Sequence, residues 1–234
     1  MLKFTPILMA VAFGLITWLF SSWRLGRQLD AQSSPLDDPI IGAHVASLGH
    51  VLGLDRVKVH IHETPVLNGL AAPDGRVFVT RGFLDAYKLG KVSAEEIASV
   101  IAHELGHVAL GHARRRMIDF SGQNAIRVAL GMVLGRFIPF IGFWLANLVA
   151  GMVAARLSRQ DEFEADAYAA ALLTKAGIGT AAQKSMFAKL ARLTGEAGGN
   201  RGQLAWLMSH PKIEDRIAAI ERLEEGWRAD LPKP

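Results

Sequence analysis

The chain has 234 residues, of which 50% are hydrophobic, and a formal net charge of +4. This length suits one domain with appended segments, and the hydrophobic share indicates contact with a membrane. The scattered basic residues argue against nucleic-acid binding, and the absence of cysteine excludes disulfides, cysteine zinc sites and thiol catalysis.

The first candidate element is an uncharged, apolar segment at residues 4–20. As a helix, with a rise of about 1.5 Å per residue, it reaches the short end of a bilayer span. A cleaved signal peptide is the alternative, but only Ser21 and Ser22 offer small residues before Trp23, and cleavage favours small residues at two positions. We therefore predict an uncleaved transmembrane helix at residues 1–22, followed by a linker at residues 23–38.

The rest of the chain, residues 39–234, is predicted to form one domain. Asp38 and Pro39 begin a helix with an N-cap followed by proline, and alternating apolar residues predict a half-buried strand at 56–62. Ser93 and Glu96 form a capping box that begins a helix reaching about Arg115. The helix that begins at Pro39 is predicted to reach about residue 52. The remaining predicted elements are a turn at 72–75, a strand at 76–80, an apolar stretch at 125–155, and helices at 158–175, 180–194 and 211–227.

The helix that begins at Ser93 carries the sequence His-Glu-Leu-Gly-His at residues 103–107. Four residues turn a helix by about 400°, so His103 and His107 project from one face and are able to bind one metal ion. Glu104, one residue after the first histidine, is placed to reach a water molecule beside the metal rather than the metal itself. The pattern predicts a catalytic zinc site.

A catalytic zinc ion needs a third protein ligand and one open position. A further histidine six residues after His107 is excluded, because position 113 is alanine. The first acidic cluster after Asp119 occupies residues 161–166, and within it Glu162 and Asp166 share one helical face. A carboxylate ligand, with a second carboxylate one turn later that accepts the free N–H of a ligating histidine, is a sound arrangement.

Three segments resemble the signatures of the HtpX-, BepA- and Oma-type zinc metallopeptidase family, to which the CAAX prenyl endopeptidases are related. They are AHELGHVALGH at 102–112, SRQDEFEAD at 158–166 and SHPKIEDRI at 209–217. The segment at 67–84 is similar to the family's region before the active helix, although Gly69 and Asp74 depart from its commonest form. The resemblance implies that Glu162 is the third ligand, that Asp166 supports a ligand, and that His210 stabilises the transition state.

From this resemblance we expect an α+β fold: a mostly helical, zincin-like (gluzincin) domain with a small antiparallel sheet beside the active helix. The expected activity is that of a zinc-dependent metalloendopeptidase with one Zn²⁺ per chain, in which Glu104 is the general base. A substrate polypeptide is expected to add as a strand. The expected substrate-binding residues are Asn68, Val77, Phe78 and Val79.

The apolar stretch at residues 125–155 measures about 46 Å as a helix, whereas two bilayer crossings need about 60 Å. Since His107 and Glu162 must meet at one ion, we predict a hairpin near the cleft that enters one membrane face without crossing, with breaks at Gly135, Pro139 and Gly142. Burial against protein, or at an interface between copies, is the alternative, and the oligomeric state stays open.

The expected role is cleavage of misfolded or membrane-associated proteins, and the expected location is the bacterial inner membrane with the peptidase domain on the periplasmic side. Two other functions remain as alternatives. One is a chaperone or assembly factor that uses the same cleft without proteolysis. The other is an intramembrane prenyl-protein endopeptidase, which would need a chamber of several spans that this sequence lacks.

Overall fold

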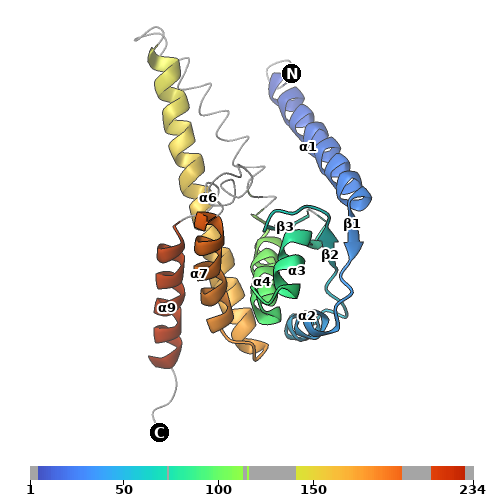
Figure 1. Ribbon diagram of the computed structural model, residues 1–234. Helices are drawn as coiled ribbons and strands as arrows, with labels where there is room; N and C mark the ends of the chain where they lie inside the picture. Colours follow the sequence, from blue (N-terminus) through green and yellow to red (C-terminus); the bar gives the residue numbers. More distant parts are fainter. Residues whose placement is uncertain (1–4, 73, 113–114, 116–140, 197–211, 230–234) are drawn as a thin grey trace. The chain divides into compact units, whose positions relative to one another are not determined.

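The computed structural model describes residues 5–72, 74–112, 115, 141–196 and 212–229 (Figure 1). The chain divides into two compact units: a smaller unit of residues 1–32 and 112–158, and a larger unit of residues 33–111 and 159–234. The long helix α6 (Ile141–Lys175) contributes its first part to the smaller unit and its second part to the larger one.

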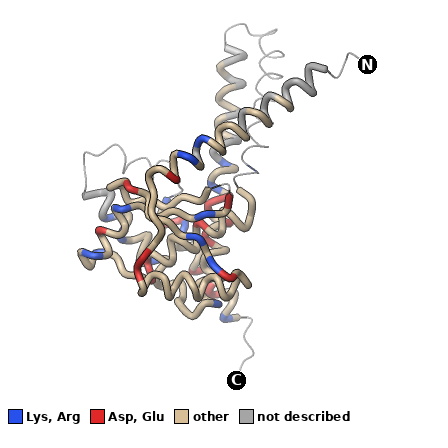
Figure 2. The backbone as a smooth tube through the Cα atoms, turned by 90° about the vertical axis from the view of Figure 1, so that its right-hand side faces the viewer, with Lys and Arg blue, Asp and Glu red and all other residues tan. Residues whose placement is uncertain are grey.

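The larger unit holds a four-stranded sheet and the helices that carry the metal motif. Acidic and basic residues are interspersed along its backbone (Figure 2). Besides the second part of α6, its elements are β1 (Ser33–Pro35), α2 (Pro39–Val51), β2 (Val59–His62), β3 (Gly69–Ala71), β4 (Val77–Thr80), α3 (Arg81–Lys88), α4 (Ala94–Ala109), α7 (Ala181–Glu196) and α9 (Ile213–Ala229).

The sheet is mixed, with the strand order β1-β2-β4-β3. The predicted antiparallel sheet is wrong in one pairing, because β2 and β4 run parallel, with Val59 opposite Val77. After β2 the chain crosses to the outer edge, forms β3 there, and returns through a tight turn as β4 between the other strands. The predicted turn is confirmed: the N–H of Ala72 donates to the carbonyl oxygen of Arg76 at 2.8 Å, and Gly75 has a φ of 85°.

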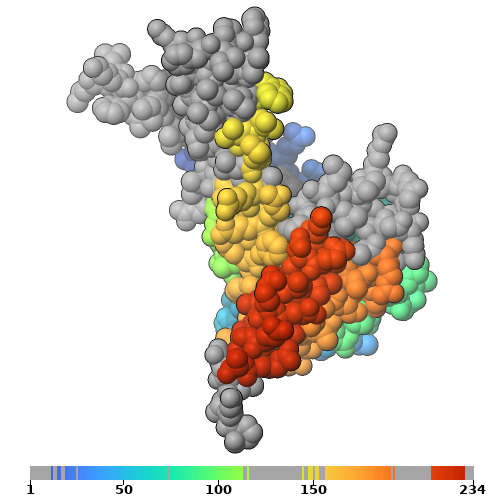
Figure 3. Space-filling model, turned by 90° about the vertical axis from the view of Figure 1, so that its left-hand side faces the viewer, coloured from blue at the N-terminus to red at the C-terminus, as the bar shows by residue number. Residues whose placement is uncertain are grey.

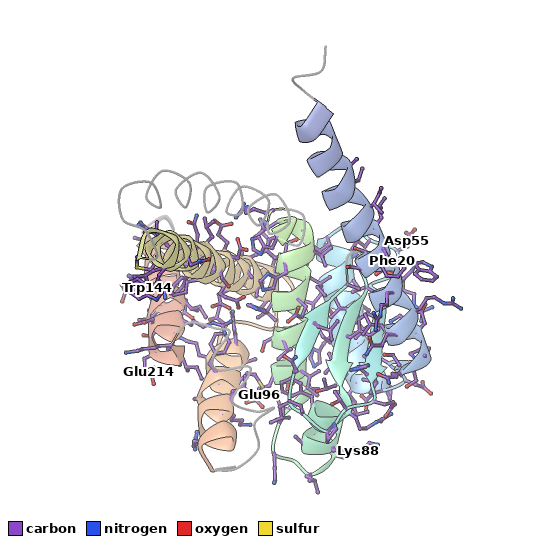
Figure 4. All side chains as sticks on the ribbon, turned by 90° about the horizontal axis from the view of Figure 1, so that it is seen from above. Phe20, Asp55, Lys88, Glu96, Trp144 and Glu214 are labelled. Carbon is purple, nitrogen blue, oxygen red and sulfur yellow. The ribbon has the colours of Figure 1, made fainter. Side chains whose placement is uncertain are left out.

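Helix α4 is the central element of the larger unit. The predicted capping box is present, with Ser93 accepting from the N–H of Glu96 and the Glu96 carboxylate accepting from the N–H of Ser93. The helix ends at Ala109, earlier than the predicted Arg115, because Gly111 adopts a φ of 65° that stops a right-handed helix. Figures 1 and 4 show α4 between the sheet on one side and α6 and α7 on the other.

Glu96 also fixes α4 to α7. Its carboxylate is 3% exposed and accepts hydrogen bonds from Ser185 at 2.6 Å and from Lys189 at 2.8 Å. Figure 4 labels Glu96 at the end of α4 that faces α7. The C-terminal helix α9 packs along α7 (Figure 3), and Lys184 of α7 forms an ion pair with Glu224 of α9 at 3.0 Å. These contacts join α4 to α7 and α7 to α9.

The predicted helix beginning at Pro39 is confirmed as α2, with Asp38 accepting from the N–H of Ile40 at 3.0 Å and of Ile41 at 2.9 Å. The alternation predicted around β2 is also confirmed, since Val59 and Ile61 are buried while His60 and His62 are half-buried. Three short elements were not predicted: β1, β3 and α3. Strand β1 and the last part of α1 (Thr5–Ala31) lie in the segment predicted as a linker, and α3 follows β4 directly.

In the smaller unit, α1 covers most of the predicted anchor, and α6 begins at Ile141 rather than at the predicted residue 158. Gly142 lies inside α6, so the break predicted there is wrong, because a single glycine near a helix end costs only about 1 kcal/mol. Residues 125–140 of the predicted hairpin, with Gly135 and Pro139, lie outside the described residues. The hairpin itself therefore stays a prediction.

In the smaller unit, the described helices α1 and α6 expose large apolar side chains. In α6 these recur every four residues and so lie on one face. Within the described part of the chain, no helix combines the length and the apolarity needed to span a bilayer. The transmembrane anchor stays a prediction. The exposed side chains are Leu15, Ile16, Leu19, Phe20 and Trp23 of α1 and Trp144, Leu148 and Met152 of α6 (Figure 4 labels Phe20 and Trp144).

Gly82 allows a close backbone contact that a stability measurement can test. A Cβ atom at position 82 would lie 2.3 Å from the carbonyl oxygen of Pro65, which is backbone and cannot rotate away. We expect Gly82→Ala to lower the free energy of unfolding by about 1–3 kcal/mol or more, as overpacking does. Gly42→Ala is the matched control, because nothing lies within 4 Å of its added Cβ and α2 should gain about 0.4–1 kcal/mol. Equal stability of the two variants in urea unfolding would contradict the contact.

Candidate metal centre

His103 and His107 form one side of a compact cluster of metal-binding atoms. Their Nε2 atoms lie 3.1 Å apart, and the two rings are nearly perpendicular, at 83°. His103 is 7% exposed and His107 is half-buried. The predicted placement of both imidazoles on one face of the helix is thus what the structure shows.

Glu162, in the second part of α6, completes the cluster. Its Oε2 lies 3.4 Å from Nε2 of His103, and its Oε1 lies 3.6 Å from Nε2 of His107. One ligand atom from each of the three side chains lies within 4.8 Å of the others. The carboxylate is 3% exposed, so it faces the imidazoles with little water around it.

The close approach of α4 and α6 depends on the glycine between the two histidines. A Cβ atom at Gly106 would lie 3.0 Å from the carbonyl oxygen of Ala165 and 3.1 Å from its Cα. Since both atoms belong to the backbone, a larger residue would push the helices apart. Gly106 therefore lets Glu162 reach the histidines of α4.

Asp166, one turn after Glu162, fixes the orientation of His103. The Nδ1–H of His103 donates to Oδ1 of Asp166 at 2.9 Å, which directs Nε2 toward the cluster. Burial lowers the pKa of His103, but hydrogen bonds to Asp166 and Glu162 outweigh it and raise the pKa to about 9. The two carboxylates thus make the His103 ring strongly basic and favour a cation at Nε2.

Arg216 of α9 holds Asp166 from the other side. Its Nε donates to Oδ2 and its Nη2 to Oδ1 of Asp166, both at 2.6 Å, in a bidentate pair. Arg216 is 0% exposed, and its guanidinium carbon lies 4.1 Å from the centroid of the Phe187 ring. Burial raises the pKa of Asp166, but the charge and hydrogen bonds of Arg216 and the hydrogen bond from His103 lower it to about 2. Asp166 is therefore a carboxylate at neutral pH.

Glu104 lies beside the two histidines and is 8% exposed. A Cβ atom built on Gly69 of β3 would lie 3.0 Å from Oε1 and 3.2 Å from Cγ of Glu104. The side chain of Glu104 therefore extends from α4 toward the outer strand of the sheet. The missing side chain at position 69 leaves room for the Glu104 carboxylate.

The cluster fits a zinc ion. Two imidazole nitrogens and one carboxylate are the ligand set typical of a catalytic zinc that keeps an open coordination position. The buried Asp166 gives His103 the carboxylate partner that metal-ligating histidines usually have. The donor set also lacks a thiolate, since the sequence has no cysteine.

The model of peptidase family M48 matches residues 40–224. That range includes α4 and its two histidines, Glu162, Asp166 and Arg216. The chain belongs to peptidase family M48.

Three relatives and one solved structure are similar to this chain. The metalloprotease LoiP of Escherichia coli strain K12 is 33% identical over 174 residues, which cover 74% of this chain and 65% of LoiP. The metalloprotease YcaL of the same strain is 32% identical over 203 residues, 86% of this chain and 75% of YcaL. The human mitochondrial metalloendopeptidase OMA1 is 25% identical over 181 residues, 74% of this chain but 34% of OMA1. The crystal structure of S. mikatae Ste24p has a TM-score of 0.47 and 22% identity, and the similarity covers 80% of this chain and 50% of Ste24p.

In this M48 chain, the prediction that a substrate polypeptide adds as a strand beside Val77, Phe78 and Val79 is wrong. These residues form β4, which pairs with β2 on one edge and β3 on the other, so neither edge accepts a further strand. The three side chains are also at most 1% exposed. The prediction failed because the position of a strand within a sheet depends on pairings that are distant in the sequence.

Two other predicted site residues, Asn68 and His210, stay predictions. The backbone of Asn68 is bonded to Thr80, since its N–H donates to Thr80 Oγ1 at 3.0 Å and its carbonyl accepts from the Thr80 N–H at 3.1 Å. A substrate contact by Asn68 stays a prediction. His210 lies outside the described residues, so its role also stays a prediction.

Sequence reasoning missed Arg216, although a signal was present. Ile213, Arg216 and Ile220 are spaced three and four residues apart, so the arginine lies within the apolar face of its helix. An arginine at such a position is buried only if a carboxylate pairs with it. In this M48 chain the partner is Asp166.

Proposed function

We propose that this chain is a zinc metalloendopeptidase that hydrolyses peptide bonds with Glu104 as the general base. The observation that carries the proposal is the convergence of His103, His107 and Glu162, with Glu104 beside them on α4. The metalloprotease names of the M48 relatives support the reaction class.

Zinc held by His103, His107 and Glu162 would polarise the scissile carbonyl and lower the pKa of the attacking water. Glu104 accepts the proton of that water and later donates it to the leaving amine, which is the usual sequence for one group acting as base and then as acid. Asp166 and Arg216 keep His103 in one orientation throughout. We also propose that His210 stabilises the charge that develops on the carbonyl oxygen.

The substrate backbone is proposed to pair with β3, the outer strand of the sheet beside α4. In this strand Leu70 lies opposite Phe78. On either side of β3, Asn68 accepts a hydrogen bond from Thr80, and Ala72 donates one to Arg76, the residue before β4. Because hydrogen bonds alternate along an antiparallel pair, Gly69 and Ala71 direct their N–H and C=O groups to the outer edge. Gly69 lies next to Glu104, so a strand added there would pass the cluster.

We further propose that the enzyme is anchored in a membrane and acts on misfolded or membrane-associated proteins. The uncharged segment at residues 4–20 and the exposed apolar face of α6 support membrane attachment. A bacterial inner membrane, with the peptidase on the periplasmic side, remains the proposed location.

The metal and the activity are tested together with a ligand variant. Purified protein should contain about one zinc per chain and cleave casein, and Glu162→Ala should lose both because a buried ligand is removed. Glu164→Ala is the matched control, since position 164 points about 200° away from Glu162 on the same helix. Metal content by mass spectrometry and casein cleavage are the readouts. Near-normal zinc in Glu162→Ala would instead assign the third ligand to Asp161 or Glu164.

A further inference from the structure

Helix α1 and the first part of α6, both in the smaller unit, share one sequence pattern. Exposed apolar residues recur every four positions, and an exposed arginine takes the next position in the series. Residues four apart lie one above the other on a helix, so each arginine continues an apolar face. The series are Ile16, Phe20 and Arg24; Leu15, Leu19, Trp23 and Arg27; and Trp144, Leu148, Met152 and Arg156.

The apolar members of these series are exposed and large. Trp144 is 63% exposed, Phe20 is 58% exposed and Trp23 is 56% exposed. A contiguous apolar face of this kind marks a surface that contacts a partner or a membrane. What distinguishes these faces is the charge at the end of each one.

The arginines indicate which occupant fits. Arg24, Arg27 and Arg156 are exposed, and among the residues that the structure describes none of them pairs with a carboxylate. Residues 1–29 and 120–160, which contain these helix segments, hold no acidic residue in the sequence. The fitting occupant therefore carries negative charge directly beside an apolar layer. Phosphate headgroups above acyl chains in an anionic lipid leaflet have this arrangement.

Trp23 and Arg27 show the geometry of such a boundary. The guanidinium carbon of Arg27 lies 5.3 Å from the centroid of the Trp23 ring, and the Phe20 ring lies 5.9 Å from it on centroids. Tryptophan is enriched at membrane–water interfaces, where its apolar ring and its polar N–H are both accommodated. A guanidinium stacked on a ring by its face keeps the N–H groups at its edge directed outward, where they are able to donate to phosphate oxygens.

The arginines occupy corresponding places in the two helices. Arg27 lies shortly before Gln32, and Arg156 lies shortly before Ser158, the two residues at which the segments of the smaller unit end. Arg156 also belongs to the same helix as the proposed ligand Glu162. The change from apolar face to arginine thus occurs in both helices just before the chain enters the larger unit.

We propose that α1 and the first part of α6 bind anionic phospholipid, with acyl chains against their apolar faces and headgroup phosphates on Arg24, Arg27 and Arg156. The inference rests on the proposed membrane attachment and adds the class of lipid and the residues that select it. Each arginine close to an anionic surface strengthens binding by about fivefold.

The first test measures which lipid contacts the protein. The full chain is reconstituted in phosphatidylcholine vesicles with spin-labelled phosphatidylglycerol or spin-labelled phosphatidylcholine of the same acyl chains. The immobilised fraction of each label gives the relative association of the two lipids. The wild type should prefer phosphatidylglycerol by about fivefold or more, and the triple variant Arg24→Gln, Arg27→Gln, Arg156→Gln should lose most of that preference. Equal association of both lipids with the wild type would overturn the proposal.

Arg156→Gln alone, compared with Arg222→Gln, tests whether the position of the charge matters. Arg222 is the matched control, because it is an exposed arginine on α9 in the larger unit. Arg156→Gln should reduce the preference for phosphatidylglycerol, and Arg222→Gln should keep the wild-type value. An equal loss in both variants would attribute the preference to net charge and refute the headgroup sites. Casein cleavage should be unchanged in both, since neither arginine belongs to the metal cluster.

Vesicle flotation separates this inference from the proposed membrane attachment. A chain that floats with vesicles but shows no lipid preference would keep the attachment and refute the headgroup sites alone. A chain that floats with neither neutral nor anionic vesicles would refute both. A second copy on the α6 face would appear as a dimer in detergent that Trp144→Gln dissociates. Such a dimer, without a preference for phosphatidylglycerol, would overturn the lipid proposal.

Discussion

Glu104→Gln is expected to abolish hydrolysis while leaving zinc content and folding unchanged. The substitution keeps the size of the side chain and leaves His103, His107 and Glu162 in place. It removes the carboxylate that accepts the proton of the attacking water, and positioned general base catalysis is worth about 10²- to 10⁴-fold in rate. The measurement is casein or peptide cleavage at equal zinc loading, with the unfolding transition as a check on the fold.

The same variant separates a protease from a chaperone that uses the same cleft. A protease with Glu104→Gln should bind substrate without turnover, so the variant should retain uncleaved clients that the wild type degrades. A chaperone should show no turnover in the wild type and equal protection of clients in both forms. Full cellular function of Glu104→Gln, together with an inactive, zinc-loaded wild type, would refute the enzymatic assignment.

The core of the site was predictable because its signals are local. The capping box of Ser93 and Glu96 and the spacing of His103 and His107 each depend on residues within one or two turns of helix. Both are present in the structure. The face shared by Glu162 and Asp166 is local in the same sense. The meeting of α4 and α6 at one metal cluster depends on residues that are far apart in the sequence. It was predicted from the resemblance to a known family.

The failures concern features that no short segment determines. The parallel pairing of β2 and β4 results from the route of the chain through β3, and no residue of either strand specifies it. The start of α6 at Ile141 was missed because the change from apolar to charged sequence suggested a boundary, whereas the helix continues through it. The second error comes from treating a change in local pattern as a change in structure, and the first from a pairing that is distant in the sequence.

Arg216→Met is expected to have the largest effect on stability. The substitution leaves the carboxylate of Asp166 buried at 1% exposure without its bidentate partner, and breaking a buried ion pair in this way costs about 3–5 kcal/mol. Arg222→Met is the matched control, because Arg222 is exposed on the same helix and surface substitutions change stability by only about 0.5 kcal/mol. The free energy of unfolding in urea, measured with zinc chelated, gives the effect on the protein alone.

Arg216→Met should also weaken zinc binding by about 10- to 100-fold, since Asp166 no longer holds His103 in a fixed orientation. Asp166→Asn in the Arg216→Met background removes the unpaired charge, so it should restore part of the stability. It should not restore zinc affinity, because an amide no longer strengthens the basicity of the His103 ring. If the double variant recovered both properties, Arg216 would serve only to neutralise a buried charge. If stability returns without zinc affinity, the pair of Arg216 and Asp166 positions the metal ligand as well as stabilising the fold.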